Sequence, residues 1–209
     1  RAHALQIVEE LIRLVPQSNV ESLQRFRKEF GAEFEAGERF KQKPKDFQDA
    51  FWGDTDDSFR LGIKLTRKTM KLFAPFYTSD IIIASPLGLR LVTESGLTTE
   101  HQSEKDELND ALNNTATKKK KKMVSGDRDF LSSIEICILD HCDMLQQQNW
   151  EHSTTLLSRL NKLPRDTRDA DISRLRTWYL DKHAIFKRQT IFLSSAITPE
   201  LNAVISQHC

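Results

Sequence analysis

Residues 80–86 read DIIIASP, and this run decides the fold. β-Branched apolar side chains follow one another without polar alternation, which is typical of a strand buried on both faces of a parallel sheet. Two more runs of this kind follow, at residues 134–139 and 190–193. Because segments with helical periodicity lie between the later runs, the sequence predicts a doubly wound, mainly parallel α/β sheet flanked by helices.

The expected helices are marked by apolar residues at a spacing of three and four. One runs from Leu5 to the residue before Pro16, and a shorter one follows over residues 23–30. Further patterns occur at residues 156–163 and 172–178, whereas residues 31–46 read as a loop. Thr198-Pro199-Glu200 predicts a helix start after the third strand, because Thr can cap a helix and Pro fits its first position.

Residues 54–72 predict another helix, with one charged face. Asp54, Asp56 and Asp57 suit a helix N-terminus, where the helix dipole favours negative charge. An apolar stripe of leucines lies opposite a basic stripe that comprises Arg60, Lys64, Arg67, Lys68 and Lys71. Such a basic face either binds RNA or an acidic partner, or is simply the solvated side of a half-buried helix.

Composition favours a soluble globular protein of the cytosol or nucleus. Hydrophobic residues make up 38% and charged residues 29% of 209 residues, and no apolar run approaches the roughly 18–20 residues that a membrane-spanning helix needs. The net charge of +1 gives no global argument for nucleic acid, so any basic footprint has to be local. Three cysteines without C-x-x-C spacing fit a reducing compartment. The chain begins with Arg1 and has no secretory signal pattern, so we expect a part of a longer protein.

Residues 93–128 differ from the rest, being rich in Glu, Asn, Thr and Lys and poor in apolar periodicity. We expect a disordered insertion there, within one lobe formed by residues 1–92 and 129–209. The run Lys118–Lys122 is a candidate nuclear or nucleolar address or a nonspecific RNA contact, and a solvated insertion explains it equally well.

The second predicted strand ends in the polar group Asp140, His141, Cys142 and Asp143, which has the form of a Walker B element. In an ATPase the first carboxylate of that element serves Mg²⁺, and the following Glu orients the attacking water. His141 stands at the Glu position and offers no fixed negative charge. Hydrolysis is therefore not expected, although Asp140 and Asp143 could also serve only to cap the next helix.

A phosphate-binding loop is not found in the chain either. The P-loop pattern G-x-x-x-x-G-K-S/T needs glycines for backbone contact with phosphates and a Lys for charge. The nearest pair, Gly31 and Gly37, is one residue too far apart and is followed by Glu38. A zinc site is not expected, because Cys137, Cys142 and the histidines lack paired ligand spacing. No cofactor and no metal are predicted.

The three strand ends together resemble elements of DEAD-box RNA helicases. Residues 85–90, SPLGLR, resemble the T-P-G-R element, residues 140–143 resemble D-E-A-D, and Ser195-Ala196-Ile197 resembles S-A-T. Their order is similar to that of the first RecA-like lobe. The resemblance implies a degenerate nucleotide site at Asp140–Asp143, Ser195 and Ala196.

The same resemblance implies RNA backbone contacts at Ser85, Pro86 and Arg90. Leu87 and Leu89 depart from the pattern. A purely structural strand-to-helix turn is therefore the alternative for these residues.

A more specific resemblance is carried by three stretches: residues 56–62, DDSFRLG, residues 77–90, YTSDIIIASPLGLR, and residues 148–152, QNWEH. They look like the U3 small nucleolar RNA-associated protein 25 family, also called digestive organ expansion factor. Membership implies a noncatalytic pseudohelicase scaffold of the nucleolar small-subunit processome, in the nucleus, for pre-rRNA processing toward 18S rRNA. The implied partners are pre-rRNA or the U3 small nucleolar ribonucleoprotein and other processome proteins, with no membrane. An active ATP-dependent RNA helicase and an α/β interaction domain without RNA contact remain the alternatives.

Overall fold

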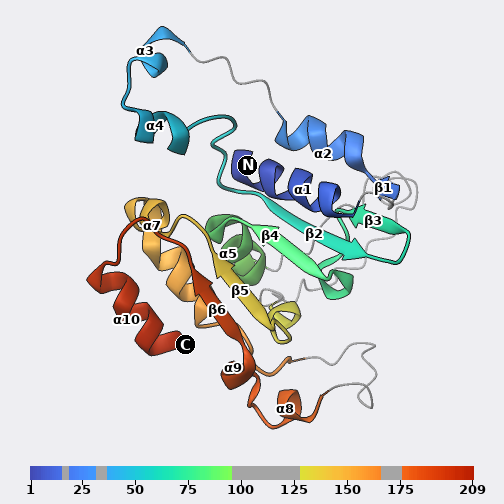
Figure 1. The fold of residues 1–209 in the computed structure, drawn as a ribbon. Helices are drawn as coiled ribbons and strands as arrows, with labels where there is room; N and C mark the ends of the chain where they lie inside the picture. The colour runs from blue at the N-terminus through green and yellow to red at the C-terminus, as the bar shows by residue number, and fades with distance from the viewer. Residues whose placement is uncertain (16–18, 32–36, 96–127, 166–175) are drawn as a thin grey trace, which may run out of the picture. The chain divides into compact units, whose positions relative to one another are not determined.

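The computed structural model describes residues 1–15, 19–31, 37–95, 128–165 and 176–209 (Figure 1). These residues form two compact units, Arg1–Leu89 and Arg90–Cys209, each a mixture of helices and strands. The chain is thus a mixed α/β protein. Among the helices in these ranges, none combines the length and the apolar character needed to cross a lipid bilayer.

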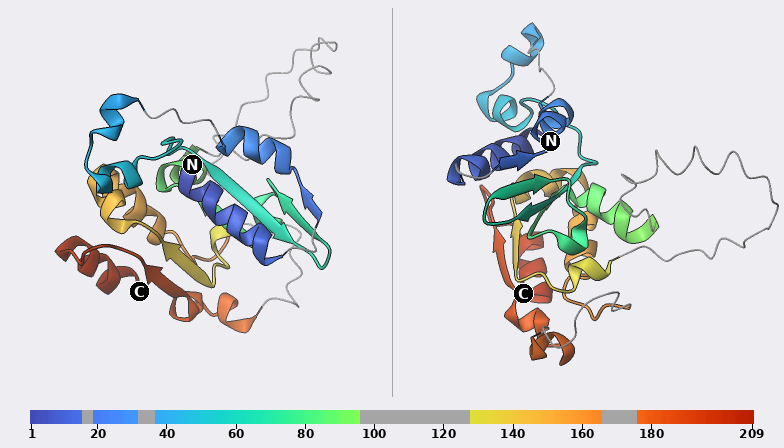
Figure 2. Two further views of the ribbon diagram at one scale, coloured as in Figure 1. Left: turned by 45° about the horizontal axis from the view of Figure 1, so that its top comes forward. Right: turned by 90° about the vertical axis from the view of Figure 1, so that its right-hand side faces the viewer.

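Helices α1 (Ala2–Leu14) and α2 (Leu23–Phe30) lie against the sheet of the first unit, and Figure 2 shows α1 along that sheet in two further views. Both were predicted from their apolar spacing. Ala4, Val8, Phe26 and Phe30 are buried, and the two Phe rings stack with their centroids 4.7 Å apart. The segment expected to be a loop, residues 31–46, contains the short helix α3 (Glu38–Lys41) and the start of α4 (Lys45–Ala50).

The first sheet has four strands in the order β1-β3-β2-β4. They are β1 (Asn19–Glu21), β2 (Arg60–Leu65), β3 (Thr69–Leu72) and β4 (Ile81–Ala84), with the 3₁₀ turn η1 (Phe76–Thr78) before β4. β2 is antiparallel to both neighbours, whereas β1 and β3 are parallel. This sheet is therefore mixed, which corrects the expectation of a mainly parallel one.

The basic helix expected over residues 54–72 is wrong, because this segment forms the β2–β3 hairpin. Leucines at this spacing fit a helix, but the deciding pattern has period two: Leu61 and Ile63 on β2, and Met70 and Leu72 on β3, are each at most 1% exposed. Gly and a β-branched residue also weaken a helix here. Burial of these four side chains against α1 and α2 stabilises the strands over any local helical preference.

The acidic residues that were expected to start that helix have another role. They precede β2 in a segment without regular secondary structure, where Asp54 and Asp56 accept from Arg1 at 3.4 and 2.8 Å. Asp56 also accepts from the backbone N–H and the hydroxyl of Ser58, each at 2.8 Å, and these bonds lower the pKa of its carboxyl.

The second unit contains the parallel strand pair β5 (Ile136–Leu139) and β6 (Gln189–Phe192). Its helices are the larger part of α5 (Pro86–Ser95), α7 (Cys142–Leu157), α8 (Thr177–Leu180), α9 (Ala184–Lys187) and α10 (Pro199–His208), with the 3₁₀ turn η2 (Asp129–Leu131). Both strands and α10 were predicted. The cap of α10 is confirmed, since the Thr198 hydroxyl accepts from the N–H of Leu201 at 3.2 Å.

Three predictions fall wholly or partly on residues that the structure does not describe. One of them is the helix expected over residues 172–178, of which only residues 176–178 are described. The expected insertion at 93–128 lies outside the described residues except at its ends, where residues 93–95 finish α5 and Arg128 precedes η2. The run Lys118–Lys122 lies wholly outside them.

Candidate functional site

The residues predicted to form a degenerate nucleotide site follow β5 and β6, at one edge of this strand pair. The strands are parallel and in register, with Leu139 beside Phe192. The residues that follow them therefore meet at the same edge. Leu193 N–H donates to the carbonyl of Leu139, and Cys142 N–H donates to the carbonyl of Leu193, both at 2.9 Å.

Asp143 and Ser195 form the side-chain link across this edge. The Ser195 hydroxyl donates to Oδ2 of Asp143, while Oδ1 of Asp143 lies 3.0 Å from the N–H of Met144. The Ser195 hydrogen bond is the main cause of a lowered Asp143 pKa. Asp143 is thus an ionised carboxylate whose hydrogen bonds join the start of α7 to the loop after β6. Ala196 follows in the same loop, where its carbonyl accepts from the Ser194 hydroxyl at 2.8 Å.

Asp140 contacts His141, the residue at the position predicted for the catalytic Glu. His141 has a left-handed backbone, with φ 52° and ψ 50°, immediately before α7. Its N–H donates to Oδ1 of Asp140 at 2.9 Å, and its Nδ1 lies 3.0 Å from Oδ2. Both oxygens that would serve a metal ion therefore contact His141. A non-glycine residue in this conformation carries a backbone cost, which the surrounding contacts have to offset.

Cys142 has a structural role. Its side chain is fully buried, its Sγ lies 3.4 Å from the carbonyl of Leu139, and burial raises the pKa of the thiol. A buried, protonated thiol is neither a good nucleophile nor a good metal ligand. In the described ranges no group of three His, Cys, Asp or Glu side chains is arranged to hold a metal ion.

Ser85 and Pro86, the predicted RNA contacts after β4, form the start of α5. The Ser85 hydroxyl accepts from the N–H of Gly88 at 3.0 Å and donates to the carbonyl of Phe59 at 3.2 Å, so it caps the helix. Pro86 occupies the first helical position, where its missing N–H has no cost. A Cβ added at Gly88 would lie 2.4 Å from the Phe59 carbonyl oxygen, which explains the glycine. These contacts favour the structural reading of the S-P-x-G pattern.

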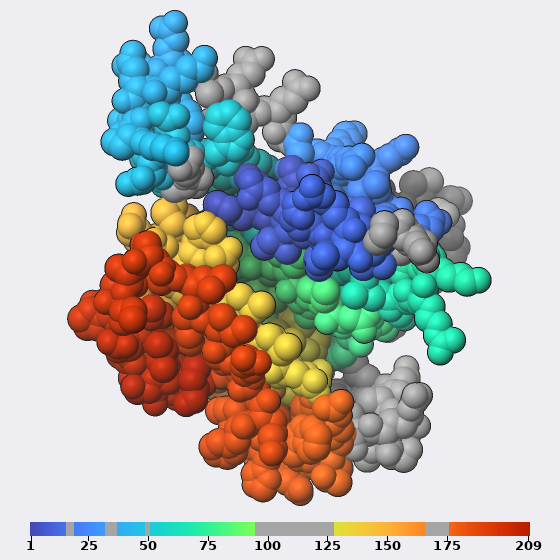
Figure 3. Space-filling view, viewed as in Figure 1, coloured from blue at the N-terminus to red at the C-terminus, as the bar shows by residue number. Residues whose placement is uncertain are grey.

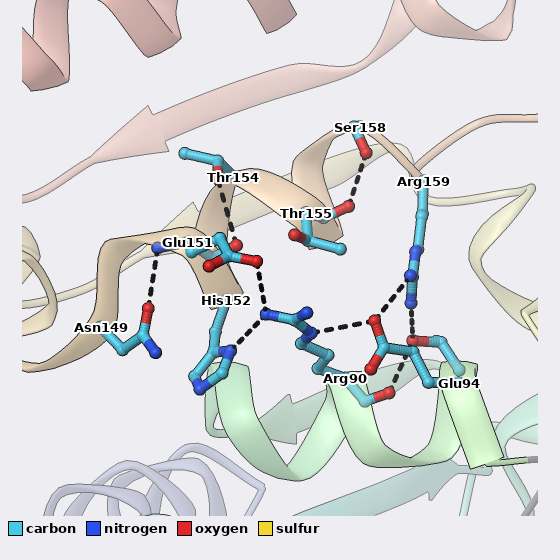
Figure 4. A network of polar contacts seen from close by, with 10 residues as sticks. Arg90, Glu94, Asn149, Glu151, His152, Thr154, Thr155, Ser158 and Arg159 are labelled. Carbon is cyan, nitrogen blue, oxygen red and sulfur yellow. Dashed lines mark hydrogen bonds and ion pairs between the residues drawn. The ribbon is translucent and has the colours of Figure 1, made fainter.

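Arg90 is the centre of a polar network between α5 and α7 (Figure 4). Its Nε donates to Glu94 at 2.9 Å, and one terminal nitrogen lies 3.3 Å from Glu151 and 2.8 Å from Nδ1 of His152. Glu94 also accepts from Arg159 at 2.8 Å, and the bond from Arg90 is the main cause of a lowered Glu94 pKa. The Arg90 guanidinium therefore makes hydrogen bonds within the second unit, and these bonds occupy N–H groups that would otherwise bind a phosphate.

A break in α7 brings the partners of Arg90 into place. Asn149 has non-helical angles, φ −145° and ψ 91°, and its Oδ1 accepts from the N–H of Glu151 at 3.2 Å. Asn149 thus starts a second helical segment, on which Glu151 and His152 point to Arg90 (Figure 4). Sequence reasoning missed this network, and the only signal for it was the QNWEH stretch itself.

The predicted basic residues are gathered on the β2–β3 hairpin and not on a helix. Lys64 and Lys71 are direct partners across the two strands, and Arg67 and Lys68 lie in the turn that joins them. Arg60 is the first residue of β2.

The comparisons with known proteins agree with the resemblance seen in the sequence. Residues 1–209 match the family model described as "UTP25, NTP hydrolase-like domain". The chain is 43% identical over 203 residues to the U3 small nucleolar RNA-associated protein 25 of Schizosaccharomyces japonicus, which covers 97% of this chain and 28% of the relative. No solved structure matches the chain.

Animal and plant proteins are similar as well. The Xenopus tropicalis homolog of the same protein is 38% identical over 213 residues, covering 100% of this chain and 25% of the relative. Protein NUCLEOLAR FACTOR 1 of Arabidopsis thaliana is 39% identical over 228 residues, covering 100% of this chain and 27% of the relative. The chain spans about a quarter of the length of these relatives. It belongs to the U3 small nucleolar RNA-associated protein 25 family and corresponds to that family's NTP hydrolase-like domain.

Proposed function

We propose that this chain is a noncatalytic, RecA-like lobe that serves as an assembly platform in the small-subunit processome of the nucleolus. The names of its relatives support a role in the nucleolus, since these relatives are named as U3 small nucleolar RNA-associated proteins and as a nucleolar factor. In this role the protein contributes to pre-rRNA processing toward 18S rRNA, with the U3 ribonucleoprotein and other processome proteins as partners.

The RecA-like assignment is supported by the strand ends of the second unit. A helix follows each strand of the parallel β5–β6 pair, and polar residues gather at the carboxyl edge, as in nucleotide-binding α/β folds. We propose that residues 1–92 and 129–209 together make the lobe, with residues 93–128 inserted in it.

The observation that supports the noncatalytic assignment is that His141 contacts both carboxylate oxygens of Asp140. A hydrolytic site needs a carboxylate for Mg²⁺ and a second group that orients water. Here His141 contacts both oxygens of Asp140, and Asp143 is bonded to Ser195. Gly31, one of the two glycines nearest to a P-loop pattern, ends α2 and donates its N–H to Arg27 at 2.9 Å.

The proposal is tested by substituting Asp140 in cells that depend on the substituted protein. Asp140→Asn keeps the size of the side chain and one acceptor oxygen, but removes the charge that any metal-dependent hydrolysis requires. We expect 18S rRNA levels and pre-rRNA intermediates, followed by RNA blotting, to match those of wild type. An active helicase predicts the opposite, namely loss of 18S rRNA with normal protein abundance.

The second candidate is an interaction domain without RNA contact. It is favoured by one observation, the use of Ser85 and Arg90 in internal hydrogen bonds. Photo-crosslinking of the full-length protein to pre-rRNA separates the two, because the second candidate predicts no crosslinks within this domain.

A further inference from the structure

The β2–β3 hairpin concentrates positive charge on a short element. Residues 60–72 contain five cations and no Asp or Glu. Among the described residues, none of these five forms an ion pair. Charge of one sign gathered on one short element is the usual electrostatic footprint of a polyanion site. We propose that this hairpin binds the sugar-phosphate backbone of RNA, which deepens the proposed function by locating an RNA contact.

The fold forces the cations to the outside of the hairpin. Side chains alternate along a strand, and the residues between the cations, Leu61, Ile63 and Met70, are buried in the core of the first unit. Lys64 and Lys71 therefore share the outer face and are direct partners across the strands. Both are exposed, and so are Arg67 and Lys68 in the turn.

This arrangement is unfavourable for the free protein. Like charges directly opposite each other in an antiparallel pair are destabilising. Two acids lie near the hairpin: Glu21 is the register partner of Lys71 on β1, and Asp80 accepts from the N–H of Leu65 at 2.7 Å. Neither forms an ion pair with a hairpin cation among the described residues. A bound row of phosphates would remove the repulsion between Lys64 and Lys71.

The turn that carries the other two cations is held in place. The N–H of Thr66 donates to the carbonyl of Thr69 at 2.8 Å, the N–H of Thr69 donates to the hydroxyl of Thr66 at 2.9 Å, and the two hydroxyls lie 2.6 Å apart. The tip of the hairpin stands clear of the helices of the first unit in the space-filling view (Figure 3). Ordering the site on binding therefore has a low entropic cost.

The chemistry of the outer face favours phosphate over an acidic protein. Protein interfaces are enriched in aromatic residues and depleted in Lys. No aromatic side chain lies on residues 60–72, and the polar neighbours of the cations are threonines. Lysines act as point charges on phosphate and read no base sequence. The site is therefore expected to bind RNA in a salt-dependent, sequence-tolerant way.

The test compares two double variants of the full-length protein that lose the same charge. Lys64→Gln with Lys71→Gln removes the facing pair, and Lys28→Gln with Lys45→Gln removes two exposed cations of the same unit outside the hairpin. Binding of a labelled single-stranded RNA of mixed sequence is followed by fluorescence anisotropy over a series of salt concentrations. Each phosphate contact on a single strand contributes about 0.7 to the slope of log affinity against log salt, so the hairpin variant should lose about 1.4.

Folding provides the second readout. Because neutralising facing lysines removes a repulsion, the hairpin variant should melt at or above the temperature of wild type while binding RNA less tightly. The control should keep the wild-type slope. Equal slopes in wild type and hairpin variant, or an equal loss in both variants, would overturn the proposal.

Binding of a glutamate-rich peptide that depends on Lys64 and Lys71 while RNA binding does not would also overturn it, in favour of an acidic protein partner. None of these outcomes bears on Asp140 and 18S rRNA levels, so failure here is distinct from failure of the noncatalytic assignment.

Discussion

At the scale of single residues, side chains that resemble catalytic or RNA-binding elements are used to hold the fold together. Ser85 caps α5, Arg90 joins α5 to α7, and Asp143 accepts from Ser195. The sequence resemblance assigned Asp143 and Ser195 to one degenerate nucleotide site, and the parallel strands β5 and β6 bring the two residues together. It could not predict the partners of Arg90, since Glu151 and His152 reach it only through the break at Asn149.

Asp143 should make the stability of the folded protein depend on pH in the acidic range. Its pKa is lowered below the ordinary value of 3.8 in the folded state, so its contribution is fully present above that pH and is lost as pH falls through the folded pKa. We expect the melting temperature of the wild-type protein to fall more steeply below pH 3.8 than that of Asp143→Asn. Ser195→Ala removes the main cause of the lowered Asp143 pKa and should bring the acid dependence of the melting temperature closer to that of Asp143→Asn. Identical acid profiles of wild type and Asp143→Asn would contradict this role.

At the scale of elements, sequence patterns predicted β4, β5 and β6 from their continuous apolar runs, and α1 and α10 from their helical spacing and clear ends. The β2–β3 hairpin was missed for a physical reason. Leu61, Leu65 and Leu72 fit a helical stripe as well as a strand. The packing of β2 and β3 against α1 and α2 favours the strand. The five cations were assigned to a helix, whereas four of them lie on the exposed part of this hairpin and Arg60 begins β2.

The break in α7 gives a prediction at this scale. Asn149→Ala removes the oxygen that accepts from the N–H of Glu151, so the second helical segment loses its cap. We expect a loss of about 1 kcal/mol in the free energy of unfolding, measured by denaturant titration. Asn149→Asp keeps an acceptor oxygen and should retain most of the stability. A wild-type value for Asn149→Ala would show that the break is held by other contacts.

At the scale of the whole molecule, the chain consists of two compact α/β units that belong to an NTP hydrolase-like domain. The polar side chains at the carboxyl edge of β5–β6 are bonded to one another. The basic hairpin and the Arg90 network are formed by other residues. We expect the domain to act through such surfaces, without the chemistry of ATP hydrolysis.

The most direct measurement is ATP turnover by the purified full-length protein, with Mg²⁺ and with and without RNA, beside its Asp140→Asn variant. The noncatalytic assignment predicts that phosphate release stays at the background rate under both conditions and is the same for the variant. RNA-stimulated phosphate release that disappears in Asp140→Asn would contradict it, because Asp140 would then be serving a metal ion in spite of its bonds to His141.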